Sequence, residues 1–424
     1  MKFQAPRGTY DILPESTPLW RWAEATFHNV CRLYGYQEIR TPAFEDTALF
    51  VRGIGEGTDM VSKEMYNFED RSGRKLTLKP EETAPAIRAY LEHSLGGPDR
   101  ITRLYYITPI FRYERPQHGR QRQSHQTGVE LIGSPEPDAD AEVIELTVRW
   151  YRELGLDNVS VKLNSLGMEE CRKAYWEALL EYAAPLIKEF KQDFRERCER
   201  NPLRLLDSKD EEIQKAMHDA PTVDAFLETE SRDHYDAVKE RLQALNVLYE
   251  EDTRLVRGLD YYTKTVFEVQ SESLGAQNAL CGGGRYDNLI EDCGGPATPA
   301  VGVAMGIERA LMVLKTENRT PNTENCPHAF AVCLTGRRSE FAKVVQSLRN
   351  AGVSVETDPN FRSAKSQFRQ ADKSGATIAV VIGDMELDSD EATVKDLQQG
   401  TEQKIAMGTL AQSLRNRAVP AADE

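Results

Sequence analysis

The 424-residue sequence lacks any long apolar run, although 40% of its residues are hydrophobic. A membrane-spanning helix needs about 18 consecutive apolar residues, and no segment approaches that length. The N-terminus, MKFQAPRGTYD, also lacks the apolar core of a secretory signal peptide. These absences predict a cytosolic protein with no membrane partner.

Cysteines are few and are not arranged in pairs. The seven cysteines are an odd number, widely spaced, and none forms a C-x-x-C pair. Neither a disulfide framework nor a zinc site is expected from such spacing, and reduced thiols fit the cytosol. We therefore expect no metal site built from the chain's own side chains.

Positive charge is in deficit, with 53 Lys and Arg against 68 Asp and Glu and a net charge of −15. Spread evenly, this charge would argue against a nucleic-acid partner. A local basic surface is enough to bind phosphate, however, so the overall charge leaves the partner open.

The first 167 residues predict a sheet with flanking helices. Apolar residues at helical spacing predict a helix over residues 17–34, with Thr17 as its N-cap. Further helices are expected over residues 80–93 and 139–154, and strands over residues 75–79, 101–114 and 128–134. A polar loop, QHGRQRQSHQ, separates the last two strands, as in an antiparallel pair.

Residues 168–250 differ from their surroundings because they are helical in pattern and heavily charged. Strands are predicted again over residues 255–270, 276–282 and 298–304. We interpret residues 168–250 as a helical insertion in a domain formed by residues 1–167 and 251–322.

A short polar segment, PNTENCP at residues 321–327, suggests a linker. Beyond it, AFAVCLT, SVET and TIAVVIG are strand candidates separated by helical stretches. This alternation predicts a separate α/β domain over residues 323–424 with a largely parallel sheet.

The segment FRYERPQHGRQRQSHQ, residues 111–126, concentrates arginine on the predicted strand–loop–strand. A basic loop of this kind is often only solvated surface. It can also bind phosphate, because guanidinium groups donate two parallel hydrogen bonds to phosphate oxygens. Arg112 favours phosphate binding, since it belongs to the apolar strand beside Phe111.

The segment LVRGLDYYTKTVFEV, residues 255–269, places Arg257 and Asp260 in an apolar and aromatic run. The alternation from Thr265 to Val269 predicts a strand with one covered face. Charged groups at a buried surface require partners. Nearby, CGGGRYD at residues 281–287 is either a tight turn or a place where a ligand approaches the backbone.

These segments together resemble the histidyl-tRNA synthetases, a family of class II aminoacyl-tRNA synthetases. GYQEIRTPAFE, FRYE and GIER resemble the three class motifs in order, and LVRGLDYY and GGRYD resemble the two signatures of the histidine family. LNSLG and NPLRLLDSK are similar to this family as well. The resemblance spans nearly the whole chain.

The resemblance implies an α+β catalytic domain with an antiparallel sheet and flanking helices, a helical insertion, and a C-terminal α/β anticodon-binding domain. It also implies a homodimer. The implied reaction uses ATP, with Mg²⁺, to convert L-histidine to histidyl-adenylate. The histidyl group then moves to the 3′ end of tRNA(His).

The same resemblance implies roles for single residues. Arg112 would bind the α-phosphate and the histidine carboxylate, Arg257 the α-phosphate, Arg309 the γ-phosphate and adenine, and Arg120 also ATP. Glu130 would accept a hydrogen bond from the imidazole of histidine. The rest of the histidine site would comprise Glu81, Thr83, Gln126, Tyr261, Tyr262 and Tyr286. Gln117 and Arg122 would contact the acceptor end of tRNA, and Asp260 would support Arg257.

The sequence departs from the family pattern at two places. Lys79 and Glu82 stand where arginine and glycine are more common, so Glu82 adds a carboxylate near the site. Ser124 stands where an aromatic residue is common, which leaves the adenine stack without its usual partner.

Three other interpretations compete with a histidine–tRNA ligase. A non-catalytic regulatory subunit of ATP phosphoribosyltransferase shares the core, but usually lacks the C-terminal domain. The others are a synthetase-like RNA-binding accessory protein and a class II synthetase for another amino acid. The arginines and both histidine-type signatures argue against all three.

Overall fold

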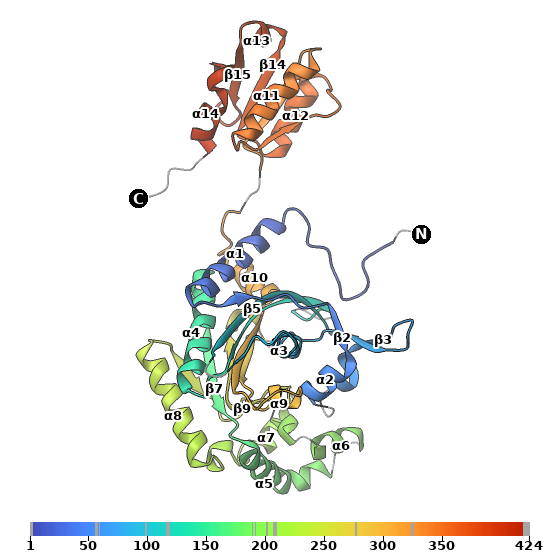
Figure 1. The fold of residues 1–424 in the computed structure, drawn as a ribbon, viewed down its shortest axis with the longest axis vertical. Coiled ribbons are helices and arrows are strands. Elements are labelled where there is room, and N and C mark those ends of the chain that lie inside the picture. The colour runs from blue at the N-terminus through green and yellow to red at the C-terminus, as the bar shows by residue number, and fades with distance from the viewer. Residues whose placement is uncertain are drawn as a thin grey trace. The chain divides into compact units, whose positions relative to one another are not determined.

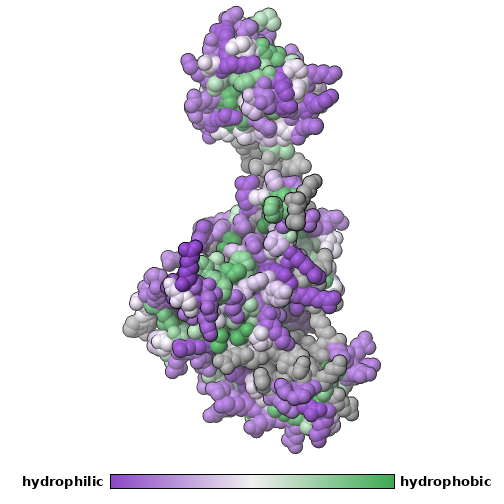
Figure 2. All heavy atoms as spheres, turned by 90° about the vertical axis from the view of Figure 1, so that its right-hand side faces the viewer, coloured by the Kyte–Doolittle hydropathy of each residue, from purple (hydrophilic) through white to green (hydrophobic). Residues whose placement is uncertain are grey.

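The computed structural model describes residues 3–55, 58, 60–97, 100–115, 119–188, 190, 192–200, 202–206, 210–275, 278–323 and 326–418. The chain forms two compact units, Met1–Asn322 and Thr323–Glu424 (Figure 1). No helix among these residues is both long enough and apolar enough to cross a membrane. On the face shown in Figure 2, polar side chains dominate the surface of both units.

The first unit is built on an eight-stranded sheet with the order β1-β5-β6-β11-β10-β9-β7-β8. The strands are β1 (Gln37–Glu38), β5 (Thr102–Phe111), β6 (Gln123–Ile132), β7 (Ser160–Ser165), β8 (Tyr249–Glu251), β9 (Thr263–Gln270), β10 (Ala279–Arg285) and β11 (Ala300–Gly306). The six central strands pair antiparallel, and the short edge strands β1 and β8 pair parallel to their neighbours. The expected antiparallel catalytic sheet is therefore confirmed.

Helices cover both faces of this sheet, with α4 on one side and α3 on the other (Figure 1). The helices outside the insertion are α1 (Thr17–Leu33), α2 (Thr47–Ile54), α3 (Thr83–Glu92), α4 (Pro137–Glu153), α9 (Leu289–Asp292) and α10 (Ile307–Thr316). A separate three-stranded sheet, in the order β2-β4-β3, comprises β2 (Phe44–Asp46), β3 (Tyr66–Glu69) and β4 (Lys75–Leu78). A one-turn π-helix spans Met60–Glu64.

Helix α1 follows the predicted amphipathic pattern with a shift at its start. Its N-cap residue is Ser16 rather than Thr17, and proline occupies its first turn. Trp20 and Phe27 extend the buried face beyond the residues expected from the sequence. These side chains join the main core between α1, α4 and the sheet.

Strand β9 differs from the prediction because it is covered on both faces. Its first five residues, Thr263 to Phe267, are all buried, since β9 lies inside the sheet between β10 and β7. The residues before it, 255–262, form no helix or strand. The predicted strand over residues 255–270 therefore begins only at Thr263.

The middle of the first unit is helical, as predicted. It contains α5 (Glu169–Ile187), α6 (Gln192–Arg200), α7 (Glu211–Ala216), α8 (Thr229–Ala244) and two 3-10 turns, Pro202–Leu205 and Val223–Ala225. Helices α5 and α7 share a small core of their own with these turns. Strand β8 follows α8 and returns the chain to the main sheet.

The second unit has a five-stranded mixed sheet with the order β13-β12-β14-β15-β16. Its elements are β12 (Ala329–Leu334), α11 (Arg338–Asn350), β13 (Val355–Thr357), α12 (Ala364–Ser374), β14 (Ile378–Gly383), α13 (Asp384–Asp388), β15 (Glu391–Asp396), β16 (Glu402–Ala406) and α14 (Met407–Ala418). The three predicted strands pair parallel, but β15 and β16 add an antiparallel hairpin. The prediction of a largely parallel sheet was wrong in this respect, although the α/β class is confirmed.

Arg285 of the GGRYD segment supports the fold. It is fully buried and forms an ion pair with Asp140 of α4, which is also fully buried. Arg285 also donates to the backbone oxygens of Ser134 and Glu136. Two buried charges satisfied in this way fix α4 against β10.

We expect Asp140→Asn to lower the free energy of unfolding of the first unit by about 3–5 kcal/mol, because it leaves the buried Arg285 guanidinium with Asp287 as its one remaining carboxylate partner among the described residues. Urea unfolding followed by tryptophan fluorescence measures this unit alone, since all four tryptophans lie in it. Asp138→Asn, at an exposed position of the same helix, is the control and should change little. Equal stability of the two variants would contradict the assigned role.

Candidate active site

A cavity of the first unit, with a volume of about 960 Å³, opens over the central strands of the main sheet. Strands β5, β6, β10 and β11, the loop 255–262 and the start of α10 all contribute to its wall. The site residues predicted from sequence that line it are Glu81, Thr83, Arg112, Arg120, Gln126, Arg257, Tyr261, Tyr262, Tyr286 and Arg309. Segments far apart in the sequence therefore meet in one pocket.

Glu130, on β6, is fully buried and does not line the pocket itself, but it contacts Tyr286 and Gly302, which do. Its carboxylate accepts hydrogen bonds from Tyr106, at 3.0 Å, and from Tyr286. Burial raises the pKa of Glu130 to about 8, although these hydroxyl groups act in the opposite direction. A carboxyl group with such a pKa changes charge readily when a ligand binds near neutral pH.

The space for the Glu130 carboxylate comes from Gly302 on the neighbouring strand. Glu130 and Gly302 are directly opposite in the β6–β11 register. A Cβ atom at Gly302 would overlap Oε2 of Glu130. Glycine is therefore required at this position by a close approach of a side chain.

Glu81 is the second buried carboxylate and lies at one end of the pocket. It accepts from the backbone N–H groups of Thr83, at 2.7 Å, and Ala84, at 2.9 Å, at the start of α3. Burial raises its pKa to about 7, while the two backbone bonds oppose the shift. The start of α3 thus holds a carboxylate at the pocket wall.

Three tyrosines complete this end of the pocket. The ring centroids of Tyr261 and Tyr262 are 4.7 Å apart, and those of Tyr261 and Tyr286 are 5.6 Å apart. All three residues are buried. They form an aromatic wall with polar hydroxyl groups beside the two carboxylates.

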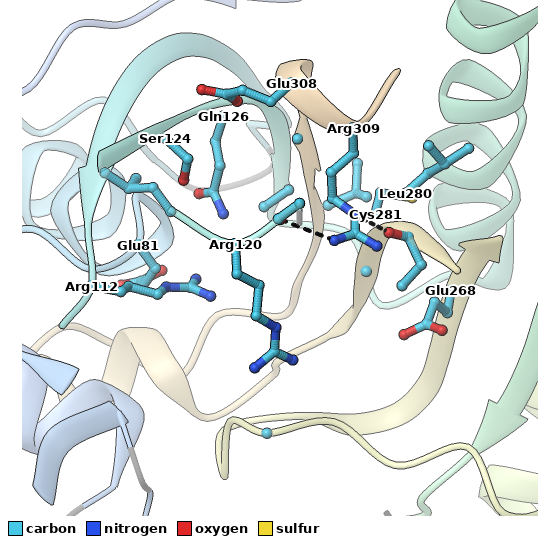
Figure 3. Close-up of a pocket in the computed structure, with 18 of the residues that line it drawn as sticks. Glu81, Arg112, Arg120, Ser124, Gln126, Glu268, Leu280, Cys281, Glu308 and Arg309 are labelled. Atoms are coloured by element: carbon cyan, nitrogen blue, oxygen red, sulfur yellow. Dashed lines mark hydrogen bonds between the residues drawn. The ribbon is translucent and has the colours of Figure 1, made fainter. Parts of the chain in front are cut away.

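Arg120 and Arg309 lie at the other end of the pocket, while Arg112 lies beside Glu81 (Figure 3). Arg112 lies just beyond the end of β5, is half-buried and donates through Nε to the Pro80 oxygen at 2.7 Å. Nη1 of Arg309 donates to the Gly119 oxygen at 3.2 Å, and burial and the nearby Arg120 lower the Arg309 pKa.

Glu114 lies between two of these arginines, 3.9 Å from Arg112 and 3.5 Å from Arg120. Glu308, next to Arg309, accepts from the backbone N–H of His125 and pairs with its ring nitrogen at 2.9 Å. The contact joins the start of α10 to β6. Glu114 and Glu308 thus fix the positions of the side chains around them in this part of the pocket.

Arg257 lies between the two ends and pairs with Glu268 of β9 at 2.5 Å. The expected partner was Asp260, and that expectation was wrong. The backbone N–H of Asp260 instead donates to the Ile54 oxygen. The guanidinium of Arg257 lies over Gly282, where a Cβ atom would overlap it.

The glycines of CGGGRYD therefore belong to a strand, β10, and not to a tight turn. Gly282 leaves room for Arg257, and Gly283 leaves room for the ring of Phe267. The tight turn was wrong, and the approach of a ligand stays a prediction, since the groups that approach these glycines are the chain's own side chains.

Some polar atoms at the pocket are buried without a hydrogen-bond partner. In the part of the chain that the structure describes, these include Nε of Arg257 and Oε1 of Gln126. Buried polar groups are normally satisfied, so these atoms are suited to a polar ligand.

The tRNA-contact predictions fall on the loop between β5 and β6. Arg122 lies there with its guanidinium 4.0 Å from the centre of the Tyr113 ring. Gln117 lies outside the described residues. Ser124 lines the pocket near Gln126, as Figure 3 shows.

The unusual residues Lys79 and Glu82 pair with each other at 2.8 Å, and both are buried. The hydroxyl of Thr41 donates to Glu82 at 2.6 Å. Neither Lys79 nor Glu82 lines the pocket. The negative charge of Glu82, which was expected near the site, is thus paired with Lys79 outside the pocket.

Three supporting residues were not identified from sequence: Tyr106, Glu114 and Glu268. Gly302 was expected to permit close packing or ligand approach, and the group packed against it is Glu130. Tyr106 contacts Glu130 across paired strands, which the sequence does not reveal. Glu268 is the one charged residue in the alternating segment Thr265–Val269. Its charge was the feature of the sequence that could have identified it as the partner of Arg257.

The raised pKa of Glu130 gives a pH prediction. Its folded pKa of about 8 exceeds the usual value of about 4.3, so its contribution to stability falls as pH rises from about 4 to about 8. Glu130→Gln removes this loss of stability, because glutamine does not ionise. The free energy of unfolding of the variant, relative to the unaltered chain, should therefore increase between pH 5 and pH 8.

Urea unfolding at several pH values, followed by tryptophan fluorescence, measures the difference. Glu153→Gln, at a half-exposed position, gives the background effect of the same exchange. A Glu130→Gln difference that stays constant with pH would contradict the raised pKa.

Comparisons with known proteins agree with this geometry. Residues 8–310 match the family of histidyl-tRNA synthetases, and residues 329–417 match an anticodon-binding domain. A histidine–tRNA ligase of Bacillus cytotoxicus is 46% identical over 423 residues, which cover 99% of this chain and 100% of that protein. One of Caldanaerobacter subterraneus is 45% identical over 418 residues, which cover 98% and 100%.

The solved apo histidyl-tRNA synthetase of Staphylococcus aureus has a TM-score of 0.83 and 37% identity, and covers 98% of this chain and 100% of its own. A structure from Bacillus halodurans described as an ATP phosphoribosyltransferase regulatory subunit/histidyl-tRNA synthetase has a TM-score of 0.64 at 23% identity, with 90% and 98% covered. That likeness concerns the fold alone. The full-length relatives and the anticodon-binding domain argue against a regulatory subunit. The chain belongs to the histidyl-tRNA synthetase family of class II aminoacyl-tRNA synthetases.

Proposed function

We propose that the pocket is where this histidine–tRNA ligase activates L-histidine with ATP, before transfer of the histidyl group to the 3′ end of tRNA(His). The observation that carries the proposal is that carboxylates, tyrosines and arginines meet in one pocket. Glu81 and the tyrosine hydroxyl groups lie at one end with Arg112 beside Glu81, and Arg120 and Arg309 lie at the other (Figure 3). Histidine and a polyphosphate need these complementary surroundings.

The histidine end offers acceptors for the cationic and N–H groups of the amino acid. Glu130 accepts from one imidazole nitrogen, and Tyr261, Tyr262 and Tyr286 enclose the ring. Glu81, with Thr83 and Gln126, receives the α-ammonium group. A site of paired polar groups rejects analogues that lack these groups far more strongly than an apolar site does.

The cationic end receives ATP. Arg112 binds the α-phosphate and the histidine carboxylate, Arg120 binds ATP as well, and Arg309 contacts the γ-phosphate and the adenine. The described residues include no group of three or more His, Cys, Asp or Glu side chains placed to hold a metal ion. Mg²⁺ therefore enters the proposal as the complex with ATP.

The first step needs positioning and charge stabilisation rather than a protein nucleophile. A carboxylate oxygen of histidine attacks the α-phosphorus in line, the bond to the bridging oxygen breaks, and pyrophosphate leaves. Arg257 and Arg112 stabilise the charge that develops on the α-phosphate. The fixed ion pair with Glu268 holds Arg257 in place for this role.

The second step involves tRNA. The hydroxyl of the terminal adenosine attacks the histidyl carbonyl, and AMP leaves. Arg122 and Gln117 are assigned to the acceptor end, where arginine contacts the backbone without reading sequence. Residues 323–424 bind the anticodon, with 1–167 and 251–322 as the catalytic domain and 168–250 as the helical insertion.

A homodimer and a cytosolic location complete the proposal. Exposed aromatic residues support the first part. Phe44 of β2 and Phe68 of β3 are exposed and contact each other, with ring centroids 5.9 Å apart. Exposed apolar groups on a small sheet are suited to burial against a second copy.

The experiment that tests the proposed reaction is exchange of labelled pyrophosphate into ATP, with purified protein and no tRNA. Exchange should occur with histidine and with no other amino acid, because the carboxylates and tyrosines match imidazole. A regulatory subunit or an RNA-binding accessory protein would show no exchange. Exchange that depends on another amino acid would overturn the assignment of the histidine end.

Arg257→Ala should lower kcat of this exchange by about 10²–10³-fold, the usual effect of removing one preorganised charge-stabilising group. Arg319→Ala, at an exposed arginine of the same unit, is the control and should leave kcat unchanged. Equal activity of the two variants would remove Arg257 from the chemistry.

A further inference from the structure

The loop 255–262 carries Arg257, Tyr261 and Tyr262, yet it forms no helix or strand. These residues have roles in the proposed function, on which the following inference rests. A loop needs fixed anchors if it is to place side chains accurately. The contacts around it show which other parts of the chain supply the anchors.

The two ends of this loop are tied to the main sheet. The side-chain amide of Asn164, on β7, donates to the Leu255 oxygen at 3.0 Å. Just beyond the loop, Lys264 exchanges two backbone hydrogen bonds with the segment after β7, to Gly167 and from Leu166, at 2.9 and 2.7 Å. These bonds place the start of α5 directly beside the start of β9.

Arg172, on the first turn of α5, contacts the part of the loop that carries the tyrosines. Its Nη1 atom donates to the oxygens of Asp260, at 2.9 Å, and Tyr262, at 3.0 Å. These two carbonyl groups lie on either side of Tyr261. One nitrogen with two N–H groups therefore holds the backbone on both sides of a tyrosine that lines the histidine end of the pocket.

Arg172 itself does not line the pocket. It belongs to the helical insertion, whose helix α5 lies below the main sheet in Figure 1. A second bond from the insertion reaches the same region, where Glu230 of α8 pairs with Lys264 at 2.8 Å. Arg172 is the contact that grips the tyrosine-bearing backbone directly.

We infer that Arg172 is a positioning residue for histidine binding, through which the helical insertion holds the histidine end of the pocket. Its action is confined to that end. The arginines assigned to ATP have other anchors, namely the Pro80 oxygen for Arg112 and the Gly119 oxygen for Arg309. Arg257 keeps its separate ion pair with Glu268.

Arg172→Ala should therefore raise the KM for histidine by about 10-fold in pyrophosphate exchange, because two charge-assisted hydrogen bonds that order the pocket are lost. The KM for ATP should change by no more than about 2-fold, because the arginines assigned to ATP have anchors of their own. Arg172→Lys should give an intermediate KM for histidine, since an ammonium group can still donate to these carbonyls. The matched control is Lys173→Ala, at the next, exposed position of α5.

The measurements are both KM values, with Tm from calorimetry as a check on folding. A lower Tm with an unchanged KM for histidine, or an equal rise in both KM values, would overturn the inference and leave Arg172 a purely structural residue. If Arg172→Ala does not fold, Arg172→Lys decides by the same separation of the two KM values.

The unaltered chain separates this inference from the proposed function. Histidine-dependent exchange by the unaltered chain, with no selective change in Arg172→Ala or Arg172→Lys, would overturn the inference alone. Absence of exchange in the unaltered chain would overturn the proposed function and this inference together.

Discussion

The pocket depends on one recurring arrangement, a charged side chain lying over a glycine of the neighbouring strand. Glu130 of β6 lies over Gly302 of β11, and Arg257 lies over Gly282 of β10. Any side chain at these glycines would occupy the space that the charges use. The glycine-rich strands β10 and β11 therefore leave the space that allows both Glu130 and Arg257 to lie close to one ligand.

This arrangement has an electrostatic cost that explains the chemistry of the pocket. Burial raises the pKa of Glu130 and Glu81 toward neutrality, and the hydroxyl and amide donors, with the charge of Arg112 beside Glu81, oppose this shift without cancelling it. Under the proposed function, the ammonium and imidazole groups of histidine add positive charge beside these carboxylates. A triphosphate in turn adds negative charge beside the guanidinium groups.

Much of the architecture follows from local sequence patterns. Helical spacing located α1 and α4, and apolar or alternating runs located some of the strands of both units. The sequence motifs also contained the residues that meet in the pocket. What local patterns could not give were contacts across strands. The role of Gly302 follows from the β6–β11 register, and the partner of Arg257 is Glu268 rather than the nearby Asp260, because β9 passes beneath the loop.

The missed hairpin of the second unit has a similar origin. Strands β15 and β16 are largely polar and partly exposed, so they carry no apolar run that would mark them as strands. Strand β15 pairs with the buried strand β14 and β16 pairs with β15, which creates the antiparallel half of the sheet. Hydrophobicity therefore predicts a strand only where the side chains of that strand are buried.

The two unusual residues of the KPEETA segment, Lys79 and Glu82, act as one paired change and not as two independent ones. A buried lysine or a buried glutamate alone would impose an uncompensated charge beside the histidine end. Paired at 2.8 Å, they neutralise each other, and Thr41 adds a hydrogen bond to Glu82. The pairing does not remove the effect of Glu82 on the site, because its negative charge still contributes to the raised pKa of Glu81. Departures from a family pattern therefore need to be judged in pairs, because the neighbour that makes a change tolerable need not cancel its effect on the site.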